Sequence, residues 1–193
     1  MSYTAHPTVV TGQTWTAANQ NTYVRDNLAA LWIFTTAGDM IYATSASVAA
    51  RLAIGASGYM MMSTGSAPSW IVFYRNWIAQ LNADAALTVG DDAARFRVPT
   101  AISGWNIHSV SASRKSGTGV PAIQIRNVST GLDVLSTKVT IDSGETDSNT
   151  AAAAAVVNTS NDDVTAGQQL AIDVDVAGTD TLYMVVSVQF LKP

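Results

Sequence analysis

Residues 170–176 read Leu-Ala-Ile-Asp-Val-Asp-Val, a run in which apolar and polar side chains alternate. Because successive side chains of a β-strand point to opposite faces of the sheet, this period of two predicts a strand with one buried face. The residues expected to face the core are Leu170, Ile172, Val174 and Val176. Asp173 and Asp175 share the other face, where we expect a solvated stripe of carboxylates.

The same alternation recurs through the second half of the chain. It is clearest in residues 135–141 and 182–190, and further strand candidates are residues 70–74, 95–98, 105–113 and 120–128. About seven or eight short strands broken by Gly-rich and Asp-rich turns are typical of a β-sandwich. We therefore predict a mainly β fold, with a short N-terminal helix and a Gly-rich segment followed by an antiparallel jelly-roll-like β-sandwich over residues 71–193.

The alanine run Ala151–Ala155 favours a helix on propensity alone. Thr150 precedes it and two valines follow it, however, and these are residues that favour β-structure. We expect a strand or an extended edge here.

Composition limits the class of protein. The 193 residues are 48% hydrophobic and 12% charged, which suffices for a sizeable core and gives a neutral, hydroxyl-rich surface. A net charge of -4 without clustered basic residues argues against nucleic-acid binding. The absence of cysteine excludes disulfides, thiolate metal sites and cysteine nucleophiles. Residues 1–10 lack the pattern of a secretory signal, and no apolar run approaches the roughly 20 residues that cross a bilayer.

The N-terminal part, residues 1–36, is expected to contain an irregular arm and one helix over Thr14–Trp32. This stretch contains no Gly or Pro, and Thr14 or Thr16 is a suitable N-cap. Apolar positions advance in steps of four and three residues, which is the seam spacing of a coiled coil. The predicted seam, and with it the predicted trimer interface, consists of Ala17, Asn21, Val24, Leu28 and Leu31. An Asn in such a seam fixes register and strand number at some cost in stability. The alternative is a single amphipathic helix packed on its own domain.

Residues 37–70 form a Gly-rich segment between the helix and the sandwich. Its apolar steps are short and are separated by Gly, Ser or Thr, which predicts short strands joined by turns. The candidate core positions are Ile41, Leu52, Ile54, Met60 and Met62. Because a two-stranded element is only marginally stable alone in water, this segment needs neighbours. They are either the rest of the chain or copies of the segment.

Three blocks of the chain resemble structural proteins of tailed-bacteriophage virions. The first is NTYVRDN at residues 21–27, and the third is LSTKVTID at residues 135–142 followed by SGETDSNTAAAAAVV. The second lies in the Gly-rich segment and consists of Gly38-Asp39, Ile41-Tyr42-Ala43, RLAIG at residues 51–55, Gly58-Tyr59-Met60-Met61, and Pro68-Ser69-Trp70. Together the resemblances cover nearly all of the chain after Thr14, and they are specific for architecture.

The resemblance implies a homotrimeric fibre or spike on the exterior of the virion, on the head or on the tail. It implies that residues 1–36 attach and trimerise the chain, and that the β-sandwich projects as the part that adheres to host surface glycan. We expect the arm Ser2–Gln13 to dock on another virion protein, because a terminus without its own core needs a partner. The expected partners are therefore copies of the same chain, other virion proteins and host surface glycan. We expect no nucleic-acid partner and no insertion into a membrane. Alternatives are a capsid decoration or cement protein that stabilises the head, a free bacterial adhesin, and a glycan-directed enzyme.

No residue pattern indicates catalysis, so we expect neither enzymatic activity nor a cofactor. His6 and His108 are the only histidines, and no serine lies in a nucleophile-elbow pattern. Two groups of carboxylates are close enough in sequence for Ca²⁺, although neither fits an EF-hand loop. They are Asp142, Glu145 and Asp147, and the pair Asp162 and Asp163. Aspartates in turns commonly accept hydrogen bonds from backbone N–H groups, so we expect no metal site.

Aromatic residues are the candidates for glycan adhesion. An aromatic ring combines a flat apolar face with polar surroundings, which suits the apolar face of a sugar. The predicted glycan contacts are Trp77, Trp105 and Tyr74. The competing interpretation is that these rings are buried at strand ends.

Overall fold

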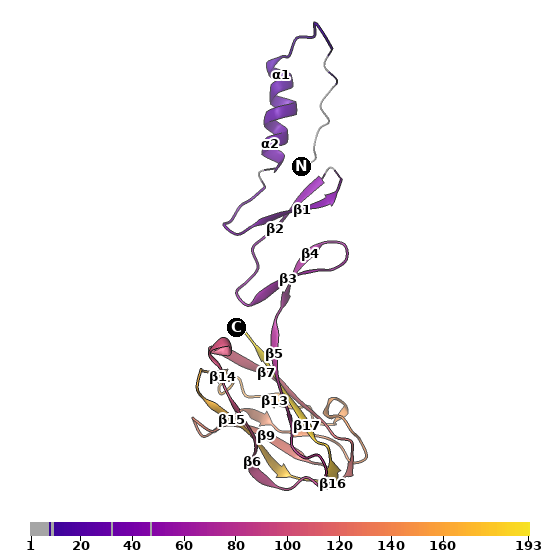
Figure 1. The fold of residues 1–193 in the computed structure, drawn as a ribbon, viewed down its shortest axis with the longest axis vertical. Coiled ribbons are helices and arrows are strands. Elements are labelled where there is room, and N and C mark those ends of the chain that lie inside the picture. The colour runs from indigo at the N-terminus through magenta and orange to yellow at the C-terminus, as the bar shows by residue number, and fades with distance from the viewer. Residues whose placement is uncertain (1–7, 9, 32, 47) are drawn as a thin grey trace. The chain divides into compact units, whose positions relative to one another are not determined.

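The structure is a computed structural model and describes residues 8, 10–31, 33–46 and 48–193, with the side chains of residues 30 and 31 left out. Internal contacts divide the chain into two units, Met1–Val72 (unit 1) and Phe73–Pro193 (unit 2) (Figure 1). The fold is mainly β with antiparallel sheets, as the sequence predicts.

Two sheets build unit 2. The first, the β5 sheet, has the order β14-β7-β17-β5 and contains β5 (Tyr74–Gln80), β7 (Trp105–Ser113), β14 (Asp163–Val164) and β17 (Val185–Leu191). The second, the β6 sheet, has the order β10-β9-β15-β6 with β12 also paired to β9. Its strands are β6 (Gly90–Arg97), β9 (Ala122–Asn127), β10 (Leu132–Asp133), β12 (Val139–Thr140) and β15 (Gln169–Val176). Smaller pairs and turns complete the unit: β8 (Ser116–Thr118) with β16 (Thr179–Leu182), β11 (Leu135–Thr137) with β13 (Val156–Val157), and the 3₁₀ turns η2 (Thr100–Ile102) and η3 (Ser148–Thr150).

The connectivity of these sheets is that of a jelly roll. When β5, β6, β7, β9, β12, β14, β15 and β17 are numbered one to eight along the chain, the β5 sheet reads 1-8-3-6 and the β6 sheet reads 2-7-4-5. Consecutive strands therefore alternate between the two sheets for most of the chain, which is the double Greek-key arrangement. The prediction of a jelly-roll-like β-sandwich is confirmed.

The core of unit 2 is formed by alternate residues of the central strands. In β15 the inward residues are Leu170, Ile172 and Val174, and in β17 they are Val186, Val188 and Phe190. The ring of Phe96 joins the two sheets, because its centroid lies 5.7 Å from that of Phe190 and 5.1 Å from that of Trp77. The period-two prediction thus holds for both strands, except at Val176, which is 47% exposed at the end of β15.

A network of charged side chains covers the outer face of the β6 sheet. Asp173 accepts from Arg126 at 2.6 Å, and Arg126 also lies 3.4 Å from Asp92. Asp92 pairs with Arg95, whose hydrogen bond lowers the pKa of Asp92. The hydrogen bond that Arg126 donates to the carboxylate of Asp173 raises the pKa of Arg126. Asp173 is only 5% exposed, so the predicted solvated stripe is wrong at this position: Arg126 on β9 covers the carboxylate.

Ala151–Ala155 follow η3 in irregular backbone and lead into β13. They form no helix, and the strand begins only at Val156. The small side chain of Ala155 packs against the core.

The helical segment of unit 1 runs over α1 (Ala17–Gln20), η1 (Asn21–Arg25) and α2 (Asp26–Leu31). Thr16 is the N-cap, because its hydroxyl accepts from the N–H of Asn19 at 3.2 Å. The middle piece is a π turn, in which the N–H of Asp26 donates to the carbonyl of Asn21. The helix is therefore present where the sequence predicts it, with a local widening that the sequence pattern does not predict.

Two hairpins follow the helix in unit 1. They are β1 (Met40–Ser45) with β2 (Val48–Leu52), and β3 (Tyr59–Ser63) with β4 (Pro68–Val72). The indole N–H of Trp70 donates to the carbonyl of Ala53 at 2.7 Å, and this bond ties β4 to the end of β2. The Trp70 ring lies so close to Gly55 that a Cβ there would come within 2.4 Å of it. A glycine is required at this position because the indole occupies the space of any side chain.

Asp39 connects the loop before β1 to the end of β2. Its carboxylate accepts from the N–H groups of Thr35 and Thr36, both at 2.9 Å, from the N–H of Ile54 at 3.0 Å and from the guanidinium of Arg51 at 2.9 Å. Gly38 beside it has φ +91°, and a Cβ there would meet the side chain of Ile54. The Gly-Asp and Arg-Leu-Ala-Ile-Gly parts of the sequence motif therefore meet at one carboxylate.

Replacing Asp39 by Asn is expected to loosen this connection in a pH-dependent way. The N–H of Thr35, together with Arg51, holds the pKa of Asp39 well below its ordinary value of 3.8. A lowered pKa means that the carboxylate stabilises unit 1 fully above the ordinary value, and that this contribution is lost as the pH falls further. Hydrogen exchange of the Ile54 amide, corrected for its intrinsic rate, should be faster in Asp39→Asn at pH 7. The exchange rate of this amide in the wild-type protein should approach the rate in the variant only at acidic pH.

Asp26→Asn is the matched control for this experiment, since Asp26 is exposed and pairs with its neighbour Arg25. It should leave the protection of the Ile54 amide unchanged. Equal protection in Asp39→Asn and wild type at pH 7 would contradict the role of the carboxylate.

Candidate functional site

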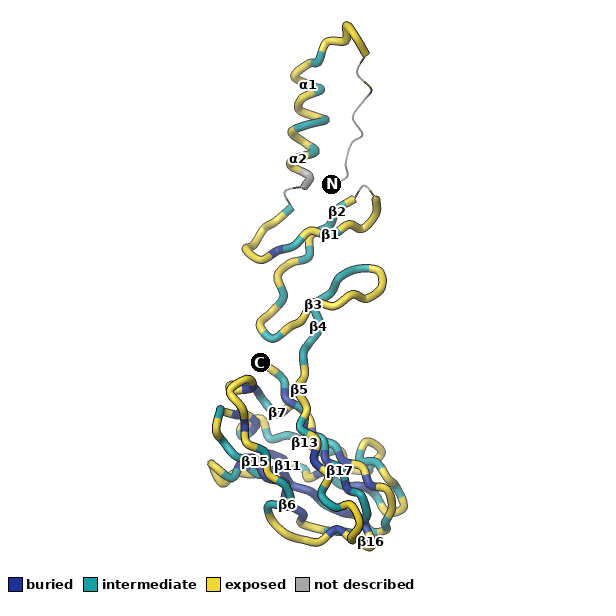
Figure 2. The backbone as a smooth tube through the Cα atoms, viewed as in Figure 1, coloured by how far each residue is buried: buried dark blue, intermediate teal, exposed yellow. Residues whose placement is uncertain are grey.

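Unit 1 lacks a hydrophobic core of its own among its described residues. Asp39 is the one buried residue there, whereas unit 2 contains all the buried apolar residues (Figure 2). The candidate core positions predicted from sequence are largely exposed: Ile41 is 39%, Ile54 52%, Met60 46% and Met62 49% exposed, and Leu52 is half-buried. The prediction that these residues form a core is wrong for the single chain, because each hairpin has no second layer to cover it.

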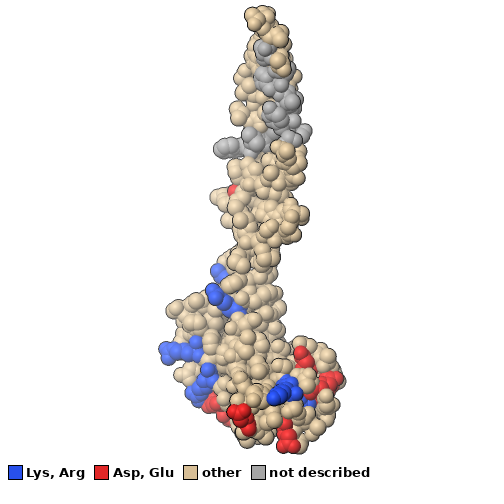
Figure 3. Space-filling model, turned by 45° about the vertical axis from the view of Figure 1, so that its right-hand side comes forward, with Lys and Arg blue, Asp and Glu red and all other residues tan. Residues whose placement is uncertain are grey.

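Unit 1 is also nearly free of charge. Its 72 residues include four charged ones, Arg25, Asp26, Asp39 and Arg51, and residues 52–74 include none. The charged side chains visible in Figure 3 accordingly lie mostly over unit 2. Exposed apolar side chains without surrounding charge are typical of a surface that is covered in an assembly.

The predicted trimer seam lies on the helical segment. Ala17 and Asn21 are exposed, Val24 is half-buried and Leu28 is 61% exposed, while the side chain of Leu31 lies outside the described residues. The π turn rotates the positions after it relative to those before it, so the seam is not one straight stripe in the single chain. Regular coiled-coil packing would require this turn to return to α-helical geometry.

On the three long strands β5, β17 and β7, the outer face of the β5 sheet presents no Lys, Arg, Asp or Glu, while the exposed Asp163 lies on the edge strand β14. We call the following set the outer β5 face: Tyr74, Asn76, Ile78 and Gln80 on β5, Val185, Ser187, Gln189 and Leu191 on β17, and His108, Ser109, Ser111 and Ser113 on β7. Arg75 is the one Lys, Arg, Asp or Glu in these three strands, and it alternates away from this face to lie 4.7 Å above the ring of Phe73. Hydroxyl, amide and ring groups therefore dominate the face.

Tyr74 and His108 bring two rings together at one end of the outer β5 face. Both residues are exposed, and their ring centroids are 5.4 Å apart although β17 lies between their strands. The nearby hydroxyl of Ser109 donates to the side-chain amide of Gln189 at 3.2 Å. A shallow hollow of about 120 Å³ lies toward the other end, and its lining includes Ser111, Ser113, Ser187 and Asn149 together with Asp147, which borders the face.

The three predicted glycan contacts do not form one platform. Trp105 is 9% exposed, with Phe73 packed edge-on at 6.4 Å. Trp77 points to the opposite side of β5 from Tyr74 and stacks on Phe96 in the core. Of the three, Tyr74 is the exposed one. Sequence reasoning missed its partner His108 and the polar face beside it, although the alternating Ser109, Ser111 and Ser113 are a visible signal.

The acidic turn at residues 142–147 uses its carboxylates for internal hydrogen bonds. Asp142 accepts from the N–H of Ala152 at 2.8 Å, Glu145 from the hydroxyl of Thr150 at 2.5 Å, and Asp147 from the N–H of Asn149 at 2.8 Å. Asp162 is buried and Asp163 is exposed. Among the residues described, no group of three or more His, Asp or Glu side chains is placed to hold a metal ion.

His6 lies outside the described residues, and the ring of His108 contacts that of Tyr74. In the part of the chain that the structure describes, no helix is long and apolar enough to cross a membrane. Compared with protein-family models, curated proteins and solved structures, the chain has no significant match.

Proposed function

We propose that this protein is a structural subunit of a tailed-phage virion, assembled as a homotrimeric fibre or spike on the outside of the head or the tail. The observation that carries the proposal is the composition of unit 1, in which apolar residues are exposed and the buried residue is a carboxylate. A segment of 72 residues with such a surface reaches a stable state by packing against copies of itself. Its function is therefore assembly, and not catalysis.

Three copies are the smallest ring that satisfies the geometry of the hairpins. Successive residues of a strand point to opposite faces, so the exposed Met60 and Met61 on β3 require cover on both sides. In a dimer each hairpin meets one neighbour, whereas in a trimer it meets two. The seam of the helical segment would bring the three chains together at their N-terminal ends, and the arm Ser2–Gln13 would dock on another virion protein.

The replacement Asn21→Ile tests the seam. Removing the amide that the proposed seam would bury should raise the melting temperature of the oligomer and broaden the distribution of its stoichiometry, because a single polar seam residue exchanges stability for a defined strand number. Native mass spectrometry and thermal melting measure the two effects. Asn19→Ile changes the same residue type outside the predicted seam and serves as the control. An oligomer of unchanged mass that melts lower than wild type would contradict the seam.

We further propose that unit 2 adheres to a neutral host glycan through the outer β5 face. Hydroxyl and amide groups offer donors and acceptors to sugar hydroxyls, and the rings of Tyr74 and His108 offer an apolar surface. None of the residues of the face is Lys, Arg, Asp or Glu, and the acidic Asp147 and Asp163 at its borders disfavour an anionic ligand. The ligand is therefore expected to be an uncharged polysaccharide.

Replacing Tyr74 by Ala should weaken binding to purified neutral host polysaccharide about tenfold, since a stacked ring contributes up to about 1.5 kcal/mol. Titration calorimetry measures the change. The control is Leu132→Ala, which removes an exposed side chain from the β6 sheet instead. If both variants lose affinity equally, the polysaccharide binds elsewhere on unit 2. If Tyr74→Ala loses no affinity, the outer β5 face is not the binding surface.

A further inference from the structure

Three consecutive methionines occupy the strand β3, which pairs with β4 in the second hairpin of unit 1. Met60, Met61 and Met62 are 46%, 49% and 49% exposed, and Tyr59 beside them is 43% exposed. By contrast, Met184 in the core of unit 2 is 0% exposed. The hairpin therefore exposes thioethers on both of its faces, which is unusual for apolar side chains so closely spaced.

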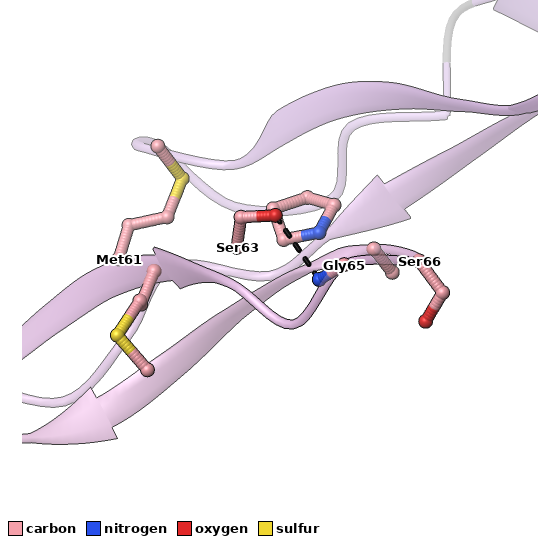
Figure 4. A pocket seen from close by; sticks show the side chains of 7 residues that line it. Met61, Ser63, Gly65 and Ser66 are labelled. Carbon is pink, nitrogen blue, oxygen red and sulfur yellow. Dashed lines mark hydrogen bonds between the residues drawn. The ribbon is translucent and has the colours of Figure 1, made fainter.

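The turn of this hairpin is fixed by internal hydrogen bonds. Thr64 and Ala67 exchange bonds, with the N–H of Thr64 donating to the carbonyl of Ala67 at 2.9 Å, and the N–H of Gly65 donates to the hydroxyl of Ser63 at 3.2 Å (Figure 4). A hollow of about 370 Å³ lies beside the turn and is lined by Met61, Met62 and the turn residues up to Pro68. A preformed hollow and protruding flexible thioethers thus occur on the same hairpin.

The chemistry of the hairpin favours a second copy of the same chain as its partner. Residues 52–74 contain no charged side chain, so identical copies approach without like-charge repulsion. The thioether is flexible and adapts to irregular apolar gaps, which suits it to filling the hollow of a neighbour. Because both faces are exposed, two neighbours are needed to cover them, and an assembly of identical chains supplies both.

We propose that Met60–Met62 form a contact between copies of this chain and that oxidation of these thioethers prevents assembly. This inference rests on the self-association proposed above. In the reaction with hydrogen peroxide, the methionine sulfur attacks one peroxide oxygen and the O–O bond breaks as an S–O bond forms. The other oxygen leaves as water after proton transfer, so sulfur is oxidised by two electrons and peroxide is reduced. The sulfoxide is polar, and burying it in the contact is unfavourable.

Peroxide footprinting of the full chain tests the contact. Sulfoxide formation at Met60–Met62 is followed by mass spectrometry in the assembled protein and in chains diluted below the concentration of assembly. Oxidation should be severalfold slower in the assembled form, while Met184 stays protected in both. Chains oxidised before assembly should stay monomeric. The triple variant Met60→Leu, Met61→Leu and Met62→Leu keeps the apolar volume and should assemble with or without peroxide.

The outcomes separate this inference from the proposal on which it rests. If the chain assembles but Met60–Met62 oxidise equally fast in both forms, the contact is wrong and the proposed assembly stands. If oxidised chains assemble as well as untreated ones, the oxidation sensitivity is wrong. A chain that is monomeric at every concentration overturns both proposals.

Discussion

A chain that begins at Phe73 is expected to fold and to remain monomeric, whereas the full chain is expected to form a larger assembly. Every buried apolar residue described lies between Ala79 and Phe190, so unit 2 retains its whole core after truncation. The truncation removes the exposed apolar hairpins and the predicted seam, on which the proposed association depends. Removing unit 1 should therefore abolish the oligomer completely.

Light scattering coupled to size-exclusion chromatography measures the mass of both chains, and near-ultraviolet circular dichroism confirms that residues 73–193 keep their packed aromatic residues. The full chain at the same molar concentration is the reference. If the truncated chain forms the same oligomer as the full chain, association depends on the sandwich and the proposal for unit 1 fails.

The architecture of unit 2 could be predicted because its signal is local. The alternation in residues 170–176 and 182–190 depends only on neighbouring residues, and the structure reproduces it in β15 and β17. The fate of Asp173 could not be predicted in this way. Its partner Arg126 lies 47 positions away and approaches only because β9 and β15 pair in the β6 sheet. A long-range pairing turned an apparently solvated carboxylate into a buried ion pair.

The candidate sites show the same division between local and long-range signals. Sequence reasoning located the Gly-Asp and Arg-Leu-Ala-Ile-Gly parts in unit 1 but not their meeting at Asp39, which depends on how the hairpin folds back. It grouped Tyr74, Trp77 and Trp105 by residue type alone. In the structure, strand alternation separates Tyr74 from Trp77, and the nearby histidine on β7 becomes the partner of Tyr74.

Replacing Phe190 by Ala should lower the free energy of unfolding of the sandwich by about 3–5 kcal/mol, the usual cost of truncating a fully buried phenylalanine. Phe190 is 1% exposed in β17, between β5 and β7, and its ring packs against Phe96. Urea unfolding of the 73–193 chain measures the change through fluorescence, since Trp77 and Trp105 are the two tryptophans in that chain. Trp77 stacks on Phe96 and so reports on the same cluster.

Gln189→Ala is the matched control, because Gln189 is the preceding residue of the same strand and faces outward. Its replacement should change the free energy of unfolding by less than about 0.5 kcal/mol, as is usual for surface positions. A shift of β17 by one residue would exchange the two effects, since such a shift turns every side chain to the other face. Comparing the losses of unfolding free energy in the two variants therefore tests the register of β17, the strand between β5 and β7. In the full chain, Phe190→Ala should still assemble through unit 1, because the proposed association and the sandwich core use different residues.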